Sequence, residues 1–393
     1  MSDLETEAVL DTNIQFQGPL AKNWQNPPSV FLTGASGFIG AYLLQVLLNE
    51  TQADIYCLVR SRDSDEGKQR LTRQLQFYQL WNERYHSRII PVVGDLSQPF
   101  LGLSESQFGD LSRCIEVIYH NGAQVNAARP YADLKKPNVL GTQEVLRLAG
   151  MTQTKPVHFI SSIAVFFSPA HHNADITETA IPDGKTLSGG YRQSKWVAEQ
   201  LVLTAQKRGL PATIHRVGRV WGHTQTGIMG NLNDSLCGLL KSCIQMGTFP
   251  IADVEVNVAP VDYISQAICR LSNQQESFGK VFHLLNAQSI SWKVFFEHVR
   301  TLGYSLEEVS EKDWTAQLKK RASAKPKEEL YSRILLMLRL SAFFSENKPR
   351  FQDGLTQEGL AGSGIHCPPL DVNLLSTYFS YFHKSGYIHK GEL

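Results

Sequence analysis

The chain has 393 residues, of which 42% are hydrophobic and 19% are charged, a composition typical of a globular enzyme with a sizeable core. This length allows one large domain or two of moderate size. The formal net charge of +1 provides no overall field that would attract nucleic acid or an anionic membrane surface, so we expect neither as a partner.

The first 28 residues are predicted to form a linker or an arm laid on the surface of a domain. They open with the acidic stretch MSDLETEAVLDTNI, which lacks the apolar core of a signal peptide, and end in Pro27-Pro28, which disfavours a helix or a central strand. No apolar run approaches the roughly 20 residues that span a bilayer. These features favour a soluble, cytoplasmic protein.

From residue 29 onward, short apolar runs alternate with helical patterns. The predicted strands are Val30–Thr33, Asp54–Val59, Ile89–Val93, Val117–His120, Val157–Ser161 and Ala212–Arg216, with one more near Lys280–Leu285. The predicted helices are Ile39–Asn49, Glu66–Tyr85, Tyr131–Ala149 and Tyr191–Arg208. Strands this short and apolar are typical of a parallel sheet with helices on both faces. We therefore predict a Rossmann-type, doubly wound parallel α/β fold.

The alternation weakens after about residue 217, which suggests a second lobe. We predict a nucleotide-binding domain over residues 29–285, with excursions to the other lobe after about 217. Residues 286–393 are predicted to form a smaller, mostly helical C-terminal lobe. Its apolar run from Leu374 to Phe382 has helical spacing and is predicted to pack in a core.

A glycine-rich turn between the first strand and the first helix predicts a dinucleotide site. Its GxxGxxG spacing lets the backbone approach a pyrophosphate, and the helix N-terminus offers N–H groups to the phosphates. The residues assigned to cofactor binding here are Thr33, Gly34, Ser36, Gly37, Phe38, Ile39 and Gly40.

The end of the second strand favours NADPH over NADH. An NAD site usually has an acidic residue there for the ribose 2′-hydroxyl, whereas this chain has Arg60. A guanidinium suits a 2′-phosphate, and Arg70 or Arg73 on the next helix is expected to assist. The alternative is that Arg60 is only a solvated charge at the end of a strand.

Two further strand ends should line the cofactor groove, because ligands of parallel sheets bind at the carboxyl ends of the strands. Asp95 and Leu96 follow the third strand, and Asp95 is expected to bind the adenine amino group. The small turn Asn121-Gly122-Ala123 follows the fourth strand.

A catalytic set is predicted from Tyr191, Lys195 and Ser162. Tyr191 and Lys195 share one helix face at i, i+4 spacing, and both are also expected to contact the cofactor. The lysine ammonium is expected to lower the pKa of the tyrosine, which would make it a usable proton donor or acceptor near neutral pH. Ser162, at the end of the fifth strand, would hold the substrate oxygen beside Tyr191.

These motifs together resemble the extended short-chain dehydrogenase/reductases (SDRs). More narrowly, the chain resembles the thioester reductase domains that terminate nonribosomal peptide and polyketide synthases, and the reductase domains of carboxylic acid reductases. The resemblance is carried by VFLTGASGFIGAYLLQVLL, CLVRSRD, VVGDLSQPFLGLSESQF, IYHNGAQVN, PYADLKKPNVLGTQEVLRLA and GYRQSKWVAEQLV. It covers nearly the whole chain, and LETEAVLD is similar to the segment that joins a carrier domain to such a reductase.

The resemblance implies NADPH-dependent reduction of an acyl or peptidyl thioester held on the phosphopantetheine arm of a carrier protein. The product would be an aldehyde, with further reduction to a primary alcohol left open. The C-terminal lobe would then bind substrate and carrier. The chain departs from many relatives in having Ser162 where they have threonine, and Arg216-Val217-Gly218 where they have Arg-Pro-Gly. The resemblance still implies a cofactor contact at Val217, after the sixth strand. Non-redox relatives lack the tyrosine that this chain has at 191.

Three other functions remain open at this stage: an extended SDR acting on a nucleotide sugar or free carbonyl compound, an acyl-CoA reductase, and a non-catalytic nucleotide-binding scaffold. The last does not need the Ser162, Tyr191 and Lys195 set. The basic run Leu318–Lys327 would suit an acidic carrier, or is simply a solvated helix end. His120, His171 and His172 lack partners at ligand spacing, so no metal is expected, and the six cysteines are expected to be reduced and mostly buried.

Overall fold

The computed structural model describes residues 4–324, 329–341 and 348–389, which form two compact units. Unit 1 comprises Met1–Gly218, Val261–Leu285 and Pro349–His366, and unit 2 comprises Arg219–Pro260, Asn286–Lys348 and Cys367–Leu393. The predicted boundary after residue 285 is wrong for Pro349–His366, because this later segment belongs to unit 1. It is held there by a contact between residues distant in the sequence. The Glu178 carboxylate accepts hydrogen bonds from the backbone N–H groups of Leu355 and Thr356.

Unit 1 is built on a seven-stranded sheet in which every strand pair is parallel, as predicted. Its order is β12-β7-β5-β4-β1-β2-β3. The strands are β1 (Ser29–Thr33), β2 (Asp54–Val59), β3 (Ile89–Val93), β4 (Val117–His120), β5 (Val157–Ser162), β7 (Ala212–Val217) and β12 (Val281–Leu284). A short pair of strands, β6 (Asp175–Ile176) and β15 (Arg350–Phe351), lies outside this sheet. The doubly wound Rossmann-type fold is thereby confirmed.

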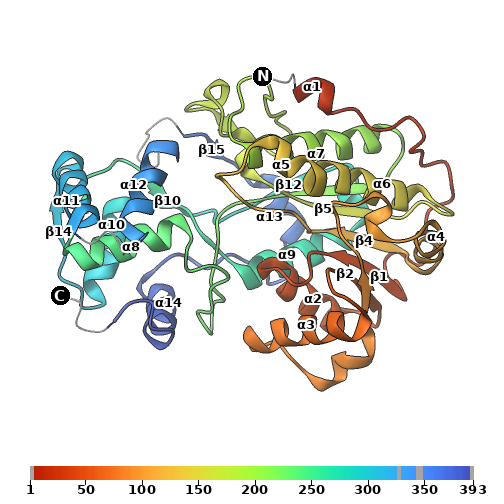
Figure 1. Cartoon of the computed structure of the whole chain (residues 1–393), viewed down its shortest axis with the longest axis horizontal. Helices are drawn as coiled ribbons and strands as arrows, with labels where there is room; N and C mark the ends of the chain where they lie inside the picture. Colours follow the sequence, from red (N-terminus) through yellow and green to blue (C-terminus); the bar gives the residue numbers. More distant parts are fainter. Residues whose placement is uncertain (1–3, 325–328, 342–347, 390–393) are drawn as a thin grey trace. The chain divides into compact units, whose positions relative to one another are not determined.

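Helices cover both faces of this sheet (Figure 1), so the central strands are fully buried. One face carries α2 (Phe38–Glu50), α3 (Ser64–Phe77) and α9 (Val261–Ser272). The other face carries α4 (Glu105–Cys114), α5 (Tyr131–Lys135), α6 (Gly141–Gly150) and α7 (Gly190–Lys207). The remaining helices of unit 1 are α1 (Leu4–Glu7) and α13 (Gly354–Leu360).

Two of the predicted helices are interrupted. The helix predicted over Glu66–Tyr85 ends at Phe77, Gln79 has a positive φ of 60°, and a separate 3-10 turn covers Glu83–Arg88. The helix predicted over Tyr131–Ala149 is split by a π-helical turn, Lys136–Leu140, which contains a proline. Proline lacks the backbone N–H that an α-helix needs at that point, which accounts for the local change in hydrogen bonding.

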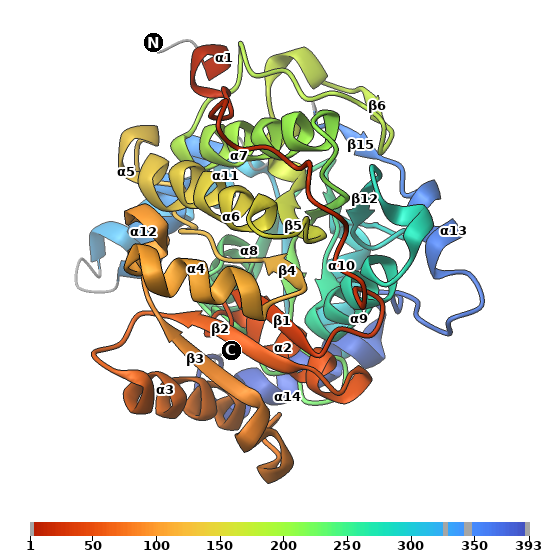
Figure 2. The same cartoon turned by 90° about the vertical axis from the view of Figure 1, so that its right-hand side faces the viewer.

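The N-terminal arm, here residues 4–28, is anchored to unit 1. Figure 2 shows it running from α1 across α7 and α6 toward β1. Its apolar side chains Leu4, Leu10, Ile14 and Phe16 are buried in the same core as residues of α6 and α7. The prediction of a surface arm therefore missed its burial, because the apolar residues in this segment follow no regular period.

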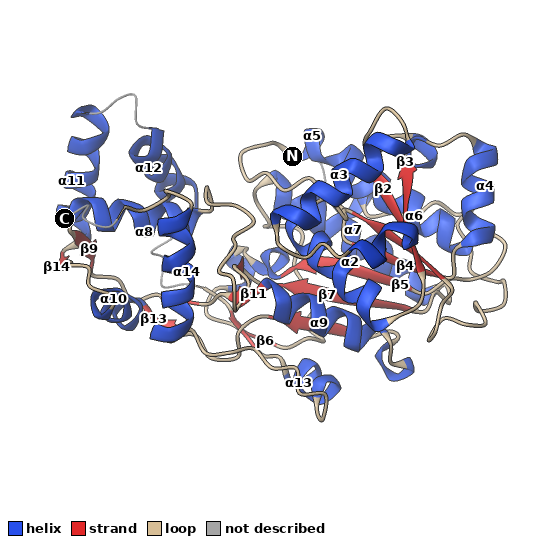
Figure 3. Ribbon diagram, turned by 90° about the horizontal axis from the view of Figure 1, so that it is seen from below, coloured by secondary structure: helices blue, strands red, loops and turns tan. Residues whose placement is uncertain are grey.

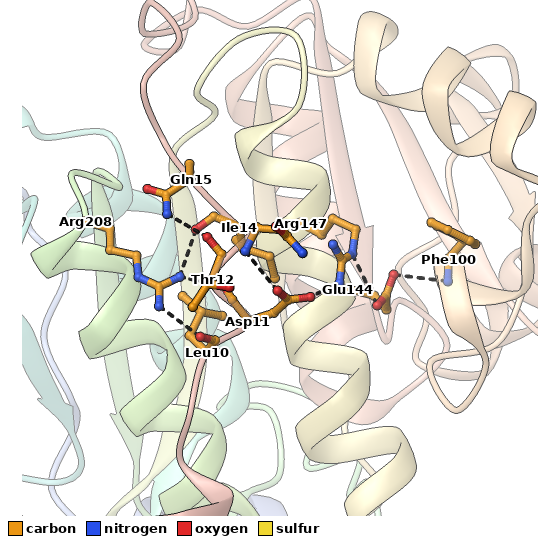
Figure 4. Close-up of polar contacts among 10 residues, drawn as sticks. Leu10, Asp11, Thr12, Ile14, Gln15, Phe100, Glu144, Arg147 and Arg208 are labelled. Atoms are coloured by element: carbon orange, nitrogen blue, oxygen red, sulfur yellow. Dashed lines mark hydrogen bonds and ion pairs between the residues drawn. The ribbon is translucent and has the colours of Figure 1, made fainter.

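Two arginines hold the backbone and one carboxylate of this arm (Figure 4). The Arg208 guanidinium donates to the carbonyl oxygens of Leu10, Asp11 and Ile14 at 2.9, 2.6 and 2.9 Å. Arg147 forms a 2.9 Å ion pair with Asp11. Hydrogen bonds from the Asn13 backbone and from Arg147 lower the pKa of Asp11.

Unit 2 is mostly helical (Figure 3). Its helices are α8 (Ser235–Met246), α10 (Trp292–Thr301), α11 (Glu311–Ala324), α12 (Glu329–Ser341) and α14 (Val372–Lys384). Its strands are β8 (Val220–Trp221), β9 (Thr248–Pro250), β10 (Glu255–Val256), β11 (Ala259–Pro260), β13 (Ile290–Ser291) and β14 (Glu307–Val309), which form short pairs. The predicted apolar run lies in α14, where Leu375, Tyr378 and Phe382 are buried in the core of this unit.

The structure also bears on the expectations for the basic run Leu318–Lys327 and for the six cysteines. In the basic run, Leu318 is buried while Lys319, Lys320 and Arg321 are exposed on α11; Lys325, Pro326 and Lys327 lie outside the described residues. All six cysteines are free thiols, but only Cys57, Cys237 and Cys243 are buried, and Cys114 is exposed. Among the described residues, no helix combines the length and the apolar character needed to cross a membrane.

Four buried histidines occupy four neighbouring strands of the sheet. They are His283, His215, His158 and His120, on β12, β7, β5 and β4. Burial lowers the pKa of His215 and His120 to about 3 and that of His283 to about 4, and it places the pKa of His158 well below its ordinary value. All four are therefore neutral in the folded protein at neutral pH.

We predict that stability falls as the pH drops below about 6.5. The unfolded chain protonates these histidines near their ordinary pKa of 6.5, whereas the folded chain does not until about pH 4 or lower. The unfolded state thus binds more protons in this window, and each histidine lowers the free energy of unfolding by up to about 1.4 kcal/mol per pH unit. Urea denaturation from pH 8 to 4 measures this loss. His158→Gln should be less stable at pH 8 yet lose less on acidification; an unchanged slope would contradict the assignment.

Removal of the Arg208 guanidinium should release the arm. Arg208→Ala removes the guanidinium hydrogen bonds to three backbone carbonyls, so we expect a loss of about 2 kcal/mol in the free energy of unfolding. Limited proteolysis should also cut residues 8–21 faster. Arg113→Ala is the matched control, because Arg113 pairs with Asp110 on an exposed helix face. Equal protease resistance of the Arg208 and Arg113 variants would show that the arm is held by its apolar residues alone.

Candidate active site

The glycine turn after β1 has a geometry that only glycine permits at two positions. Gly34 has a φ of 73°, and a Cβ there would lie 2.7 Å from the Cα of Gly122. A Cβ on Gly40 would lie 2.0 Å from the carbonyl oxygen of Gly34. Gly37 differs, because it is exposed and precedes the first turn of α2, and a Cβ there would meet the Gly34 carbonyl oxygen at a milder 3.3 Å. The turn is thus packed tightly inside, while the exposed Gly37 has no side chain to fill the space at the N-terminus of α2, where a phosphate would bind.

The ends of β1 and β4 are joined by side-chain hydrogen bonds. The Thr33 hydroxyl accepts from the Gly122 N–H at 2.8 Å and also contacts His120 Nδ1 at 2.8 Å. Asn121 Nδ2 donates to the Gly34 carbonyl at 3.3 Å. These bonds hold the two predicted cofactor segments against each other. Thr33 and Asn121 therefore act on the backbone of the turn.

The other residues predicted to bind cofactor fall at the same carboxyl edge of the sheet. Ser36, Ile39, Asp95, Leu96 and Ala123 are partly exposed, whereas Val217 is buried. The Asp95 carboxylate accepts from the N–H and hydroxyl of Ser97, both at 2.8 Å, so it already organises its own turn. Phe38 contacts the rings of Tyr42 and Tyr78 at centroid distances of 5.6 and 5.4 Å, which indicates packing.

The arginines after β2 differ in their surroundings. Arg60 is exposed, and within the described residues its guanidinium makes no hydrogen bond or ion pair. Arg70 Nη1 donates to the Arg60 carbonyl at 2.8 Å, so Arg70 supports the segment that carries Arg60. Arg73 Nε donates to the Gln69 carbonyl within its own helix. Arg60 is therefore the guanidinium available to a ligand at this edge.

Helix α7 positions Tyr191 and Lys195. Its first residue, Gly190, has no room for a side chain, because a Cβ would lie 2.4 Å from the Arg129 carbonyl oxygen. The preceding Gly189 has a φ of 92°, which favours glycine. The start of the helix is thereby fixed, and Tyr191 lies in its first turn. A hydrogen bond joins the hydroxyls of Ser162 and Tyr191, so the predicted catalytic pair is brought together.

The expected lowering of the Tyr191 pKa is wrong. Burial raises the pKa of Tyr191 to about 12, and the hydrogen bond with Ser162 offsets only part of this effect. Lys195 does not offset this shift; its Nζ donates to the Ile160 carbonyl at 2.7 Å and lies 4.2 Å from the centroid of the Phe159 ring. Tyr191 is therefore protonated at neutral pH.

Lys195 is the group at this site that gains or loses its proton near neutral pH. It is 3% exposed, and burial lowers its pKa to about 7, while the Glu199 carboxylate opposes that shift. A buried ammonium is stabilised only by the partners that the protein supplies. Around Lys195 these are one carbonyl, one aromatic ring and one carboxylate.

Three polar residues at the site were not found from the sequence. Glu199 and Arg216 form a buried ion pair with a 2.8 Å contact. Asn138, in the π-helical turn, donates to the Ser194 hydroxyl at 2.9 Å and accepts from the Gln124 N–H at 2.7 Å. Only the spacing of Glu199, four residues after Lys195, was a usable signal in the sequence.

The three histidines considered as metal ligands, His120, His171 and His172, have different surroundings. His120 is buried between Thr33 and Thr142, and His171 Nε2 accepts from the Asp183 N–H at 2.9 Å. His172 is exposed. Among the described residues, no three His, Cys, Asp or Glu side chains are grouped as metal ligands.

Comparison with known proteins gives consistent relatives. The sequence profile of the NAD-binding family described as male sterility protein matches residues 32–268. The chain is 38% identical over 385 residues to a linear gramicidin synthase polypeptide of Brevibacillus parabrevis, a match that covers 98% of this chain and 8% of that protein. It covers 25% and 26% of two further relatives, so it spans only part of the length of these proteins.

Solved structures agree with this assignment. The terminal R domain from the myxalamid PKS-NRPS biosynthetic pathway is 41% identical, with a TM-score of 0.93 and 98% of each chain covered. A thiolation-reductase di-domain from an archaeal nonribosomal peptide synthetase is 26% identical, with a TM-score of 0.77, covering 98% of this chain and 80% of that one. The chain therefore belongs to the terminal reductase domains of nonribosomal peptide and polyketide synthases, which are SDR-type oxidoreductases with an NAD-binding domain.

Proposed function

We propose that this chain releases an acyl or peptidyl group from a carrier-protein phosphopantetheine thioester by NADPH-dependent reduction, giving an aldehyde. The observation that carries the proposal is the Ser162–Tyr191 hydroxyl pair, with Lys195 one helical turn away on α7. Reduction of the aldehyde to a primary alcohol is a second round of the same chemistry. A carrier protein is the proposed partner, since the relatives are parts of multidomain synthases.

The cofactor proposal rests on three groups of residues. The N-terminus of α2 suits the pyrophosphate, because the exposed Gly37 before it has no side chain to block the approach. The exposed Arg60 suits a ribose 2′-phosphate, with Arg70 holding the backbone beneath it. The rest of the cofactor is proposed to contact four residues at the same sheet edge, namely Asp95, Leu96, Ala123 and Val217.

In the proposed reaction, the Ser162 and Tyr191 hydroxyls hold the thioester carbonyl oxygen. When bound at the N-terminus of α2, NADPH would supply the hydride for the carbonyl carbon. Tyr191 then gives its proton to the developing oxyanion, which suits a phenol with a pKa of about 12. The Lys195 ammonium stabilises the negative charge that remains on the tyrosine. Cleavage of the C–S bond expels the carrier thiolate as the hydroxyl of the hemithioacetal becomes the aldehyde carbonyl. The hydroxyl proton returns to the Tyr191 phenolate, and the thiolate takes up a proton from the solvent.

Thioester reduction is tested by NADPH oxidation at 340 nm with acyl-phosphopantetheine thioesters on a carrier protein and on CoA, with product identification. We expect turnover with the carrier-bound thioester and release of an aldehyde or alcohol. Tyr191→Phe should lower kcat by about 100-fold or more while leaving NADPH affinity nearly unchanged, because it removes only the proton donor. Tyr85→Phe is the control, since the Tyr85 hydroxyl bonds Asn49 on α2. Turnover of free carbonyl compounds without thioester reduction would contradict the proposal.

Arg60→Ala tests the proposed cofactor selectivity. Loss of a charge-assisted contact with the 2′-phosphate should weaken NADPH binding by about 10-fold or more, and NADH binding much less. Isothermal titration with each dinucleotide measures the difference. Arg62→Ala is the matched control, because Arg62 is already paired with Glu66 at 2.9 Å. Equal losses for both dinucleotides in Arg60→Ala would refute the assignment of Arg60 to the 2′-phosphate.

A further inference from the structure

Helix α7 carries a third polar side chain in line with Tyr191 and Lys195. Glu199 follows Lys195 by four residues, so the three side chains lie on one helix face, one turn apart. The proposed reaction gives a role to the first two only. Glu199 is fully buried, at 0% exposure, and a buried carboxylate requires partners.

Each member of this row is joined to a different residue at the end of β5. The Ser162 and Tyr191 hydroxyls share a hydrogen bond. Lys195 Nζ donates to the Ile160 carbonyl at 2.7 Å. The Ser161 hydroxyl donates to Glu199 Oε2 at 2.5 Å. Three consecutive residues of β5 thereby bond side chains from three successive turns of α7. Glu199, at 0% exposure, makes the most buried of these contacts.

The Glu199 carboxylate is itself held from β7. Arg216 Nε and Nη2 donate to Glu199 Oε1 at 3.0 and 2.8 Å, and both side chains are almost completely buried. The remaining Arg216 donors reach the carbonyl oxygens of Glu178 and Ala180 at 3.3 and 3.2 Å and contact His283 at 3.3 Å. Both oxygens of Glu199 are thus bonded, and its orientation is fixed from two strands.

Stability alone is a weak account of this arrangement. Two charges taken out of water lose hydration that their mutual attraction only partly recovers, and an apolar pair of similar volume often packs as well. What an apolar pair would not supply is negative charge next to Lys195. That charge favours the ammonium form of Lys195 against the effect of burial.

The groups around Lys195 come from three elements. Glu199 on α7 and His120 on β4 interact with its charge, and β5 contributes the Phe159 ring and the Ile160 carbonyl. Tyr191 lies one helical turn before Lys195 on α7, and Arg216 on β7 bonds Glu199. His120 is neutral above about pH 4, because burial lowers its pKa to about 3. Tyr191 is protonated and neutral below about pH 11. Near neutral pH, Glu199 is therefore the carboxylate that acts on Lys195, and Arg216 lies beyond it.

We propose that Glu199 is a positioning residue that fixes the row Tyr191, Lys195 and Glu199 on β5 and keeps Lys195 protonated during the reaction. Its kinetic consequence rests on the proposed function, whereas its effect on the lysine does not. Loss of the Glu199 charge should move the titration of Lys195 to lower pH, with the alkaline limb of kcat following it.

The test is a titration of Lys195 in the full chain labelled with ¹³Cε-lysine, followed by NMR, with the Lys195 signal assigned by its absence in Lys195→Met. In the unmodified chain the midpoint should lie near pH 7. In Glu199→Gln it should fall by about one pH unit or more. In Glu199→Gln/Arg216→Met the fall should be smaller, because the unpaired guanidinium is also removed. The pH profile of kcat with a carrier-bound thioester should show the same order.

Thermal unfolding of the same variants separates positioning from a structural role. The double variant should be more stable than Glu199→Gln, yet its titration should remain below that of the unmodified chain. Glu178→Gln is the matched control, because this buried carboxylate bonds His283, Leu355 and Thr356 and should cost stability without moving the titration. An unchanged Lys195 midpoint in Glu199→Gln overturns the proposal, whatever the turnover. A shifted midpoint in a chain that reduces no thioester supports it and contradicts the proposed function instead.

Discussion

The packing of α7 on the carboxyl end of β5 is the constraint on which the candidate site depends. Tyr191 meets Ser162, and Lys195 reaches the Ile160 carbonyl, only if the helix starts at the right residue and lies in the right register. The start is set by Gly190, where any side chain would collide with the backbone at Arg129. The register is set by Glu199, which is bonded from β5 and β7 together. A shift of one residue would rotate the row by about 100° away from the strand.

The candidate cofactor site, at the carboxyl ends of β1 and β4, depends on a second constraint, which is the close approach of two backbone segments. Gly34 and Gly122 lie so near each other that neither the turn after β1 nor the segment after β4 tolerates a side chain there. Thr33 and the neutral His120 close the space beneath them with hydrogen bonds. Parallel strands bring all their carboxyl ends to one edge, so the two halves of the site are built on neighbouring strands, β4 and β5.

The sequence predicted the parts of this structure that depend on local pattern. Strands β2, β3 and β4 match their predicted bounds, because buried parallel strands are short apolar runs. The interruption at Gln79 and the π-helical turn before Gly141 were not predicted, because helical periodicity continues through both. Glu199 and Arg216 are 17 residues apart, and their pairing depends on how α7 packs on β7. The sign of the Tyr191 shift was missed for a similar reason: i, i+4 spacing gives proximity to Lys195, but burial and the other contacts of the lysine decide the pKa.

The pKa values of Tyr191 and Lys195 on α7 shift in opposite directions for the same physical reason, and together the two shifts suit reduction of a carbonyl group. Burial favours the neutral form of each group, so it raises the pKa of Tyr191 to about 12 and lowers that of Lys195 to about 7. A protonated phenol is what reduction of a carbonyl requires, because the oxygen must gain a proton as the carbon gains hydride. The phenolate left behind needs a nearby positive charge, and burial alone would tend to remove that charge from Lys195. The Glu199 carboxylate, one turn further along the helix and held by Arg216 and Ser161, opposes that loss. The working pH of the proposed reaction is therefore decided by Lys195 and its buried neighbours more than by the tyrosine that donates the proton.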